Sequence, residues 1–304
     1  MKIKIPPNHE IIYESVINIA YKLIQFNYWD RISRSDLDAW LDNFETDEEK
    51  YLSAGILLSI IYRNDKSTKS FAANIIQIKL PNILKEHGIH CINSIEEWEA
   101  DLKKGNRRLP IRFSALEGVD GKPGKSGSTI YRDIRQEFFH SELGILFEDV
   151  KKVVTNDSNI KAIILFDDII GTGEQFDGYI KENELYDLGV KILYFPFAAY
   201  KNSYEEINKQ YKNIIICPVE VINDSESLFS EKNIAFFGKM HQEYTPEELK
   251  ELYIKMCKKK KIKSKMLLGH GDLALTYFFN DSVPNNNIAA LWYDSDTWTK
   301  LAGR

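Results

Sequence analysis

Two adjacent carboxylates follow a hydrophobic run at residues 161–166 and precede a turn of small residues. Asp167 and Asp168 come directly after the segment KAIILF, and the chain continues as IIGTGEQ over residues 169–175. Neighbouring carboxylates can accept hydrogen bonds from sugar hydroxyls, or hold a hydrated Mg²⁺ together with substrate oxygens. Glycines in the turn let backbone N–H groups approach an anion without a Cβ in the way. The pattern predicts a sugar-phosphate site.

This hypothesis assigns Asp167 and Asp168 to sugar hydroxyls and to Mg²⁺, held indirectly or through water, and Gly171 and Gly173 to the phosphate cradle. Acidic pairs at strand ends also occur in solvated turns and in the acidic pocket of receiver domains. A receiver domain would carry a phosphorylatable Asp at the end of a later strand. The next hydrophobic run, residues 190–200, has no Asp, which favours the sugar-phosphate interpretation.

A second group of candidate residues lies upstream, in EGVDGKPGKSGST and the helical segment after it. Residues 118–128 have two interpretations: a mobile flap that closes over a pyrophosphate, or an ordinary surface loop made of turn-forming residues. The basic residues that would neutralise a pyrophosphate are Lys122, Lys125, Arg132 and Arg135. Near the predicted helix start, Ser126, Gly127 and Ser128 offer donors for a second anion subsite.

The elements that must position these residues alternate between helix and strand. Hydrophobic runs predict strands at residues 161–166, 190–200 and 213–222, separated by helices at about 130–155, 173–188 and 201–210. This alternation predicts an α/β fold with a parallel sheet flanked by helices.

The segment before residue 105 has a different pattern. Apolar residues at helical spacing predict helices at 9–27 and 45–62, and a short helix between them with Ser35 as its N-cap. We therefore expect a helical N-terminal region, residues 1–105, followed by an α/β domain, residues 106–304.

Composition excludes several classes of protein. The 304 residues are 43% hydrophobic and carry a formal net charge of −5, which disfavours disorder and non-specific coating of nucleic acid. The three cysteines have no metal-binding spacing, and no run approaches the ~18 apolar residues of a membrane helix. We expect a cytoplasmic protein. The seven lysines within residues 255–265 favour a solvated helix end over a contact with RNA, DNA or a partner protein.

The acidic loop resembles a known family. The segment FDDIIGTGEQF is similar to the ribose-5-phosphate loop of type I phosphoribosyltransferases, which bind phosphoribosyl pyrophosphate (PRPP). Together with KSGSTIYRDIRQEF and the terminal PNNNIAALWYDSDTWTKLAGR, it resembles the phosphoribosyltransferase-like domains of bacterial conflict systems, including some retron antiphage operons. The resemblance extends from about residue 10 to residue 304, and these three motifs carry it.

The resemblance implies a role for each matching residue. One of Asp167 and Asp168 would contact the ribose hydroxyls, and both would be catalytic residues of an active enzyme. The residues implied to line the 5-phosphate are Thr172, Gly173, Glu174 and Gln175. Enzymes of the family usually end this loop with Thr or Ser, whereas this chain has Gln175, preceded by the additional negative charge of Glu174. This departure favours ligand sensing or altered chemistry.

The sequence is compatible with two functions. The first is a nucleotide sensor or effector of an antiphage system, controlled by partner proteins or RNA. The second is an active phosphoribosyltransferase that acts on a nucleobase, with carboxylates stabilising an oxocarbenium-like centre and basic side chains the leaving pyrophosphate. The sequence leaves the oligomeric state open, a homo-oligomer included.

Overall fold

The computed structural model describes residues 3–116, 126–233, 244–263 and 265–303. The chain divides into two compact units, one made of Met1–Thr68 with Ile222–Arg304 and the other of Lys69–Val221. The predicted division at residue 105 differs from this one, because the helices just before residue 105 belong to the second unit.

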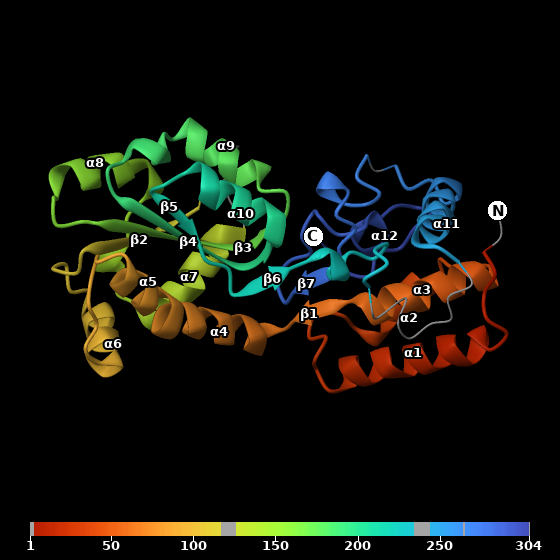
Figure 1. The fold of residues 1–304 in the computed structure, drawn as a ribbon. Helices are drawn as coiled ribbons and strands as arrows, with labels where there is room; N and C mark the ends of the chain where they lie inside the picture. The colour runs from red at the N-terminus through yellow and green to blue at the C-terminus, as the bar shows by residue number, and fades with distance from the viewer. Residues whose placement is uncertain (1–2, 117–125, 234–243, 264, 304) are drawn as a thin grey trace. The chain divides into compact units, whose positions relative to one another are not determined.

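The unit formed by residues 69–221 contains a parallel sheet. Its strands are ordered β2-β3-β4-β5, each parallel to its neighbour, and β6 pairs with β4 on the same sheet. The bounds of these strands are β2 Ile111–Ala115, β3 Ala162–Ile170, β4 Lys191–Tyr200, β5 Ile214–Ile216 and β6 Glu220–Ile222. The predicted α/β class, with a parallel sheet flanked by helices, is confirmed (Figure 1).

Helices flank the sheet on both faces. The helices in this part of the chain are α4 Asp65–Asn74, α5 Leu80–Glu86, α6 Ile95–Lys104, α7 Ser126–Phe138, α8 Val150–Asn156, α9 Glu174–Glu182 and α10 Lys201–Gln210, with a π-helix at Ile75–Lys79 between α4 and α5. Apolar residues of α9 and α10, such as Phe176 and Ile207, join the core cluster that contains Leu165 of β3. On the other face, α7 packs on β2 and β3, as Figure 1 shows.

The predicted continuous helix at 130–155 is wrong. Helix α7 ends at Phe138, and short 3-10 turns separate it from α8, which begins at Val150. The chain leaves the helix because it returns to the sheet: Gly144 forms a parallel bridge with Phe113, and the N–H of Ile145 donates to the carbonyl of Phe113. Pairing with β2 therefore replaces the helical hydrogen bonds of this segment.

The other unit combines residues from both parts of the chain outside 69–221. Its helices are α1 His9–Gln25, α2 Arg34–Leu41, α3 Asp47–Ser59, α11 Pro246–Lys259 and α12 Ala289–Trp292, and its strands are β1 Ile61–Arg63 and β7 Tyr277–Phe279, which pair in parallel. The N-cap of α2 is Ser33 and not the predicted Ser35. Ser33 and Asp36 form a reciprocal capping box, since each side chain accepts the backbone N–H of the other.

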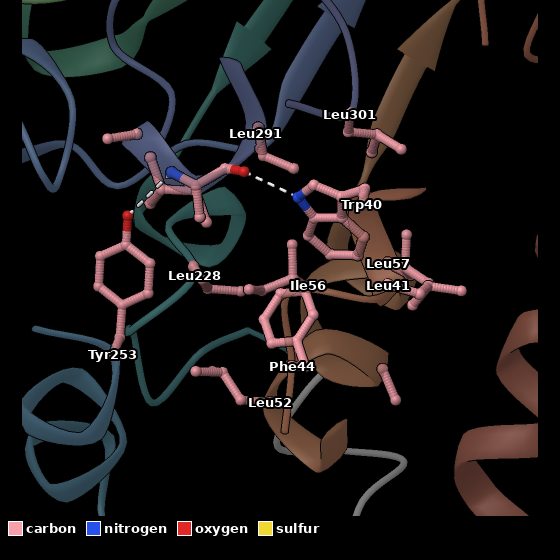
Figure 2. Packing of buried hydrophobic residues seen from close by; sticks show 14 of the residues in the cluster. Trp40, Leu41, Phe44, Leu52, Ile56, Leu57, Leu228, Tyr253, Leu291 and Leu301 are labelled. Atoms are coloured by element: carbon pink, nitrogen blue, oxygen red, sulfur yellow. Dashed lines mark hydrogen bonds between the residues drawn. The ribbon is translucent and has the colours of Figure 1, made fainter. Parts of the chain in front are cut away.

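The peptide of Ala290 joins the two parts of this core (Figure 2). The indole N–H of Trp40 donates to the carbonyl of Ala290 at 2.8 Å, and the N–H of Ala290 donates to the hydroxyl of Tyr253 at 3.2 Å. The indole of Trp298 donates to the same carbonyl at 3.0 Å. Residues separated by 250 positions in the sequence therefore share one hydrogen-bonded centre.

The lysine-rich segment begins in α11. Lys259 and Lys260 at its end contact the carboxylate of Glu45, at 2.9 and 2.6 Å. These contacts agree with the interpretation as a helix end, since part of the positive charge is neutralised within the unit. Across the described residues, the structure contains no helix with the length and apolarity needed to span a bilayer.

Candidate functional site

Strand β3 carries the acidic pair to its carboxyl end. The strand extends through Ile170 and so includes both acids, which the sequence had placed just beyond it. Asp167 and Asp168 are both buried, each with 8% of its surface exposed. The N–H of Asp168 donates to Asp167 Oδ1 at 2.9 Å, and the N–H of Ile169 donates to Asp168 Oδ1 at 2.7 Å. Each carboxylate thus binds the N–H of the following residue and stabilises the backbone there.

A tyrosine on the neighbouring strand also binds the first acid. The hydroxyl of Tyr194 on β4 donates to Asp167 Oδ2 at 2.6 Å. Tyr194 pairs with Leu165 in the β3–β4 register, two residues before Asp167, so it reaches the acid diagonally across the sheet. Its ring stacks on Phe176 of α9, with the centroids 3.9 Å apart. Burial, and then the charge of Asp167, raise the pKa of Tyr194 well above its usual value, so the hydroxyl remains a proton donor.

The turn after β3 depends on a glycine. Gly173 precedes α9 with φ +82° and ψ −12°, a left-handed conformation that favours glycine. A Cβ at this position would also approach Ile207 Cδ1 of α10 to 3.0 Å. Gly171 and Gly173 are buried, Thr172 is half-buried, and Glu174 and Gln175 are exposed. The structure therefore brings the five loop residues and the two acids together at the carboxyl end of β3.

The start of α7 lies at the same edge of the sheet. A Cβ on Gly127 would be 3.0 Å from the carbonyl oxygen of Leu116 and 3.2 Å from that of Phe166. Leu116 directly follows β2, and Phe166 directly precedes Asp167. Gly127 is thus required for the helix to approach the ends of two strands. The structure brings this predicted residue, and the backbone of its neighbour Ser126, to the edge that carries the acids.

The predicted arginines lie further along α7. Arg132 and Arg135 follow Ser126 by six and nine positions, about 9 and 14 Å along the axis at 1.5 Å per residue. Arg132 is exposed, with its Nε 3.5 Å from Asp133, and Arg135 is half-buried. The backbone of these arginines is therefore distant from the acidic turn. Lys122, Lys125 and most of the predicted flap lie outside the described residues.

Sequence reasoning missed Tyr194. A signal for it was available, because a tyrosine in the middle of the apolar run at 190–200 must find a hydrogen-bond partner when it is buried. The neighbouring hydrophobic run ends in two acids, which are the nearest candidates for that partner in a parallel sheet.

The donors at this edge can be tested for their fit to Mg²⁺. Within the described ranges, no group of three or more His, Cys, Asp or Glu side chains could hold a metal ion. Asp167 and Asp168 supply carboxylates from consecutive positions. Mg²⁺ usually binds one or two carboxylates and completes its octahedron with water and substrate phosphate oxygens. The residues therefore fit a Mg²⁺ ion that arrives with a phosphorylated ligand.

A parallel sheet of this kind, with an acidic pair and a glycine turn at the carboxyl end of a central strand, defines a phosphoribosyltransferase-like domain. More specifically, the chain belongs to the PRTase-CE family, whose family model matches residues 37–304. No curated protein and no solved structure matches the chain.

Proposed function

We propose that this chain binds PRPP or a related ribose-5-phosphate nucleotide and acts as a sensor or effector in a bacterial antiphage system, of which a retron system is one example. The observation that carries the binding proposal is the buried pair Asp167 and Asp168, followed by a turn with left-handed Gly173 at the start of α9. In α/β sheets, ligands bind at the carboxyl ends of the strands, and helix N-termini favour phosphate.

Each part of this edge has a role in the proposal. A carboxylate accepts hydrogen bonds from the ribose hydroxyls, and the backbone N–H groups around Thr172 and Gly173 bind the 5-phosphate. Bound Mg²⁺ would neutralise charge on the pyrophosphate oxygens. Further contacts are proposed for Glu174 and Gln175 in the loop and for Lys125, Ser126, Gly127, Arg132 and Arg135 upstream.

The effector function is favoured over routine catalysis by the end of the loop. Glu174 and Gln175 are exposed in the first turn of α9, where a negative side chain opposes phosphate and Gln replaces the usual hydroxyl. The resemblance to conflict-system domains also supports the effector function. The alternative function is an active PRPP-dependent phosphoribosyltransferase that acts on a nucleobase, and the retained acidic pair favours it. Partner proteins or RNA, and self-association, are further proposals of the effector model.

A calorimetric titration tests the binding proposal. The wild-type protein is titrated with PRPP in the presence and absence of Mg²⁺, beside nucleoside mono- and triphosphates. We expect Mg²⁺-sensitive binding of a ribose-5-phosphate compound, and a loss of about 1–3 kcal/mol of binding free energy in the variant with Asp167→Asn and Asp168→Asn. Asp187→Asn, at an exposed acid outside the proposed site, is the control. Unchanged affinity in a folded double variant would remove the site assignment.

A growth experiment separates effector from enzyme. We expect that expression of the wild type without neighbouring genes arrests growth, and that the Asp167/Asp168 double variant relieves the arrest, because ligand engagement needs the acids. Harmless expression, together with rapid pyrophosphate release when a free nucleobase is supplied with PRPP, would overturn the effector proposal and leave an ordinary phosphoribosyltransferase.

A further inference from the structure

We propose that Tyr194 is a positioning residue that divides the acidic pair into two roles: Asp167 holds the carboxyl end of β3 in place, and Asp168 contacts the ribose hydroxyls. The part concerning ribose rests on the proposed ligand class. The division itself concerns contacts within the chain, and it is testable without any ligand.

Asp167 accepts a hydrogen bond at each of its two carboxylate oxygens. Its Oδ2 accepts from the hydroxyl of Tyr194 at 2.6 Å, and its Oδ1 accepts from the N–H of Asp168 at 2.9 Å. Both oxygens therefore bind donors within the protein at short distances. A carboxylate held at both oxygens is fixed in orientation, and it fixes the backbone N–H that it binds.

Tyr194 is held rigidly by the packing around its ring. Its side chain is 1% exposed, and its ring stacks on Phe176 at the start of α9. It belongs to the same apolar cluster as Leu165 and Ile180, so its hydroxyl cannot turn toward solvent without opening that cluster. Asp167 is thus bound to an interior group of the sheet, and a ribose hydroxyl would have to compete with a buried donor that has no alternative partner in water.

Asp168 lies between Asp167 and the glycine turn. It is one residue closer to the glycine turn, and its Oδ1 is oriented by the N–H of Ile169 at 2.7 Å. Its backbone N–H is in turn held by Asp167. A chain of contacts therefore leads from Tyr194 through Asp167 to Asp168, with Asp168 at the end that leads into the phosphate turn. This order assigns the positioning role to the first acid and the ligand role to the second.

The first test is a double-mutant cycle in thermal and urea unfolding of the full-length protein. We expect Tyr194→Phe and Asp167→Asn to be coupled, so that the double variant loses less stability than the sum of the single variants, whereas Tyr194→Phe and Asp168→Asn should be additive. Tyr211→Phe is the matched control, since its hydroxyl donates to Asp177 at 2.7 Å in the same apolar cluster. Additivity between Tyr194 and Asp167 would overturn the positioning role.

The second test is calorimetric titration of the same variants with Mg·PRPP. We expect Asp168→Asn to weaken binding at least tenfold with little change in the unfolding midpoint. Tyr194→Phe should weaken binding three- to tenfold and Asp167→Asn should lower the unfolding midpoint, while the control Tyr211→Phe should leave affinity unchanged. Equal loss of affinity in the two Asn variants, with none in Tyr194→Phe, would overturn the division. No binding by the wild type would overturn the proposed function and with it the ligand role of Asp168, while the unfolding cycle still decides the role of Tyr194.

Discussion

Gly173 lies directly against Ile207, because a Cβ placed on Gly173 would approach Ile207 Cδ1 to 3.0 Å. The next nearest atom is Cβ of Ser203, at 3.4 Å, also on α10. The turn that follows the acidic pair is therefore packed against a neighbouring helix before any ligand arrives. Its conformation results from this packing and from the positive φ of Gly173, so the backbone N–H groups of the turn are preorganised.

The first expectation concerns this glycine. Gly173→Ala should destabilise the protein by about 1–2 kcal/mol, because a left-handed φ is unfavourable for alanine and the methyl group would crowd Ile207. Gly178→Ala, within α9, should have the opposite effect and stabilise the protein by up to about 1 kcal/mol, since nothing lies within 4 Å of its added Cβ. Urea unfolding measures both. Equal effects of the two substitutions would contradict the role of the turn.

The second expectation concerns the start of α7. Gly127→Ala replaces a helical glycine by a better helix former, yet we expect a loss of about 1–3 kcal/mol because the methyl group would meet the carbonyls of Leu116 and Phe166. Ser128→Ala, at the half-buried neighbour, is the control and should change stability little. Chemical denaturation compares the two. A stabilising Gly127→Ala would show that α7 does not approach the strand ends this closely.

The third expectation is a dependence of stability on pH. Hydrogen bonds from Lys260 and then from Lys259 lower the pKa of Glu45 from 4.5 to about 2. A lowered folded-state pKa stabilises the fold above the unfolded value, and the contribution disappears as pH falls through the folded value. Glu45→Gln should therefore lower the melting temperature slightly above pH 4.5, and the difference should shrink as the pH falls and vanish below about pH 2.

Salt provides the control for this exposed group. The difference between wild type and Glu45→Gln should shrink at high ionic strength, since charges at the surface are screened. Melting curves at several pH values and two salt concentrations measure both effects. A difference that persists unchanged at pH 2, or in high salt, would contradict an ionic contribution from Glu45.

The fourth expectation concerns the core around Ala290. Trp298 is 1% exposed, packs edge-on against Phe44 at 5.4 Å, and donates its indole N–H to the Ala290 carbonyl. Trp298→Ala should destabilise this unit by about 3–5 kcal/mol. Hydrogen exchange should show a loss of protection in α3, because Phe44 and α3 share the cluster with Trp298. Protection of β3, in the other unit, is the internal control. Unchanged exchange in α3 would contradict the shared core.

Much of the sheet could be predicted from the sequence. The hydrophobic runs before Asp167 and after Leu188 have the length and β-branched content of buried strands, and the glycine turn is visible in the spacing. The apolar run around Tyr194 indicates that its hydroxyl needs a partner, but the choice of Asp167 depends on the register between β3 and β4, which the local sequence does not encode. The end of α7 at Phe138 could not be predicted for a similar reason, because the pairing of Gly144 with Phe113 of β2 is a contact between distant parts of the sequence.

The division into units was harder to predict for a physical reason. Residues 1–68 and 222–304 form one core through contacts such as Trp40 with Ala290, and amphipathic periodicity shows that a face is buried without showing its partner. A change in the residue pattern along the chain, such as the one near residue 105, reflects local composition. The division into compact units depends instead on which distant segments pack together.

The unit made of residues 1–68 and 222–304 affects the order of folding during synthesis on the ribosome. Residues 69–221 are complete while the last part of the chain is still being made, whereas α1 to α3 must wait for α11, α12 and Trp298 before their core can close. At 5–20 residues per second, the synthesis of residues 222–304 takes roughly 4–17 s. During that interval the sheet with the acidic turn is free to fold while apolar residues of the first helices remain uncovered. The sheet edge that carries Asp167 and Asp168 would then form before the core of the other unit is assembled.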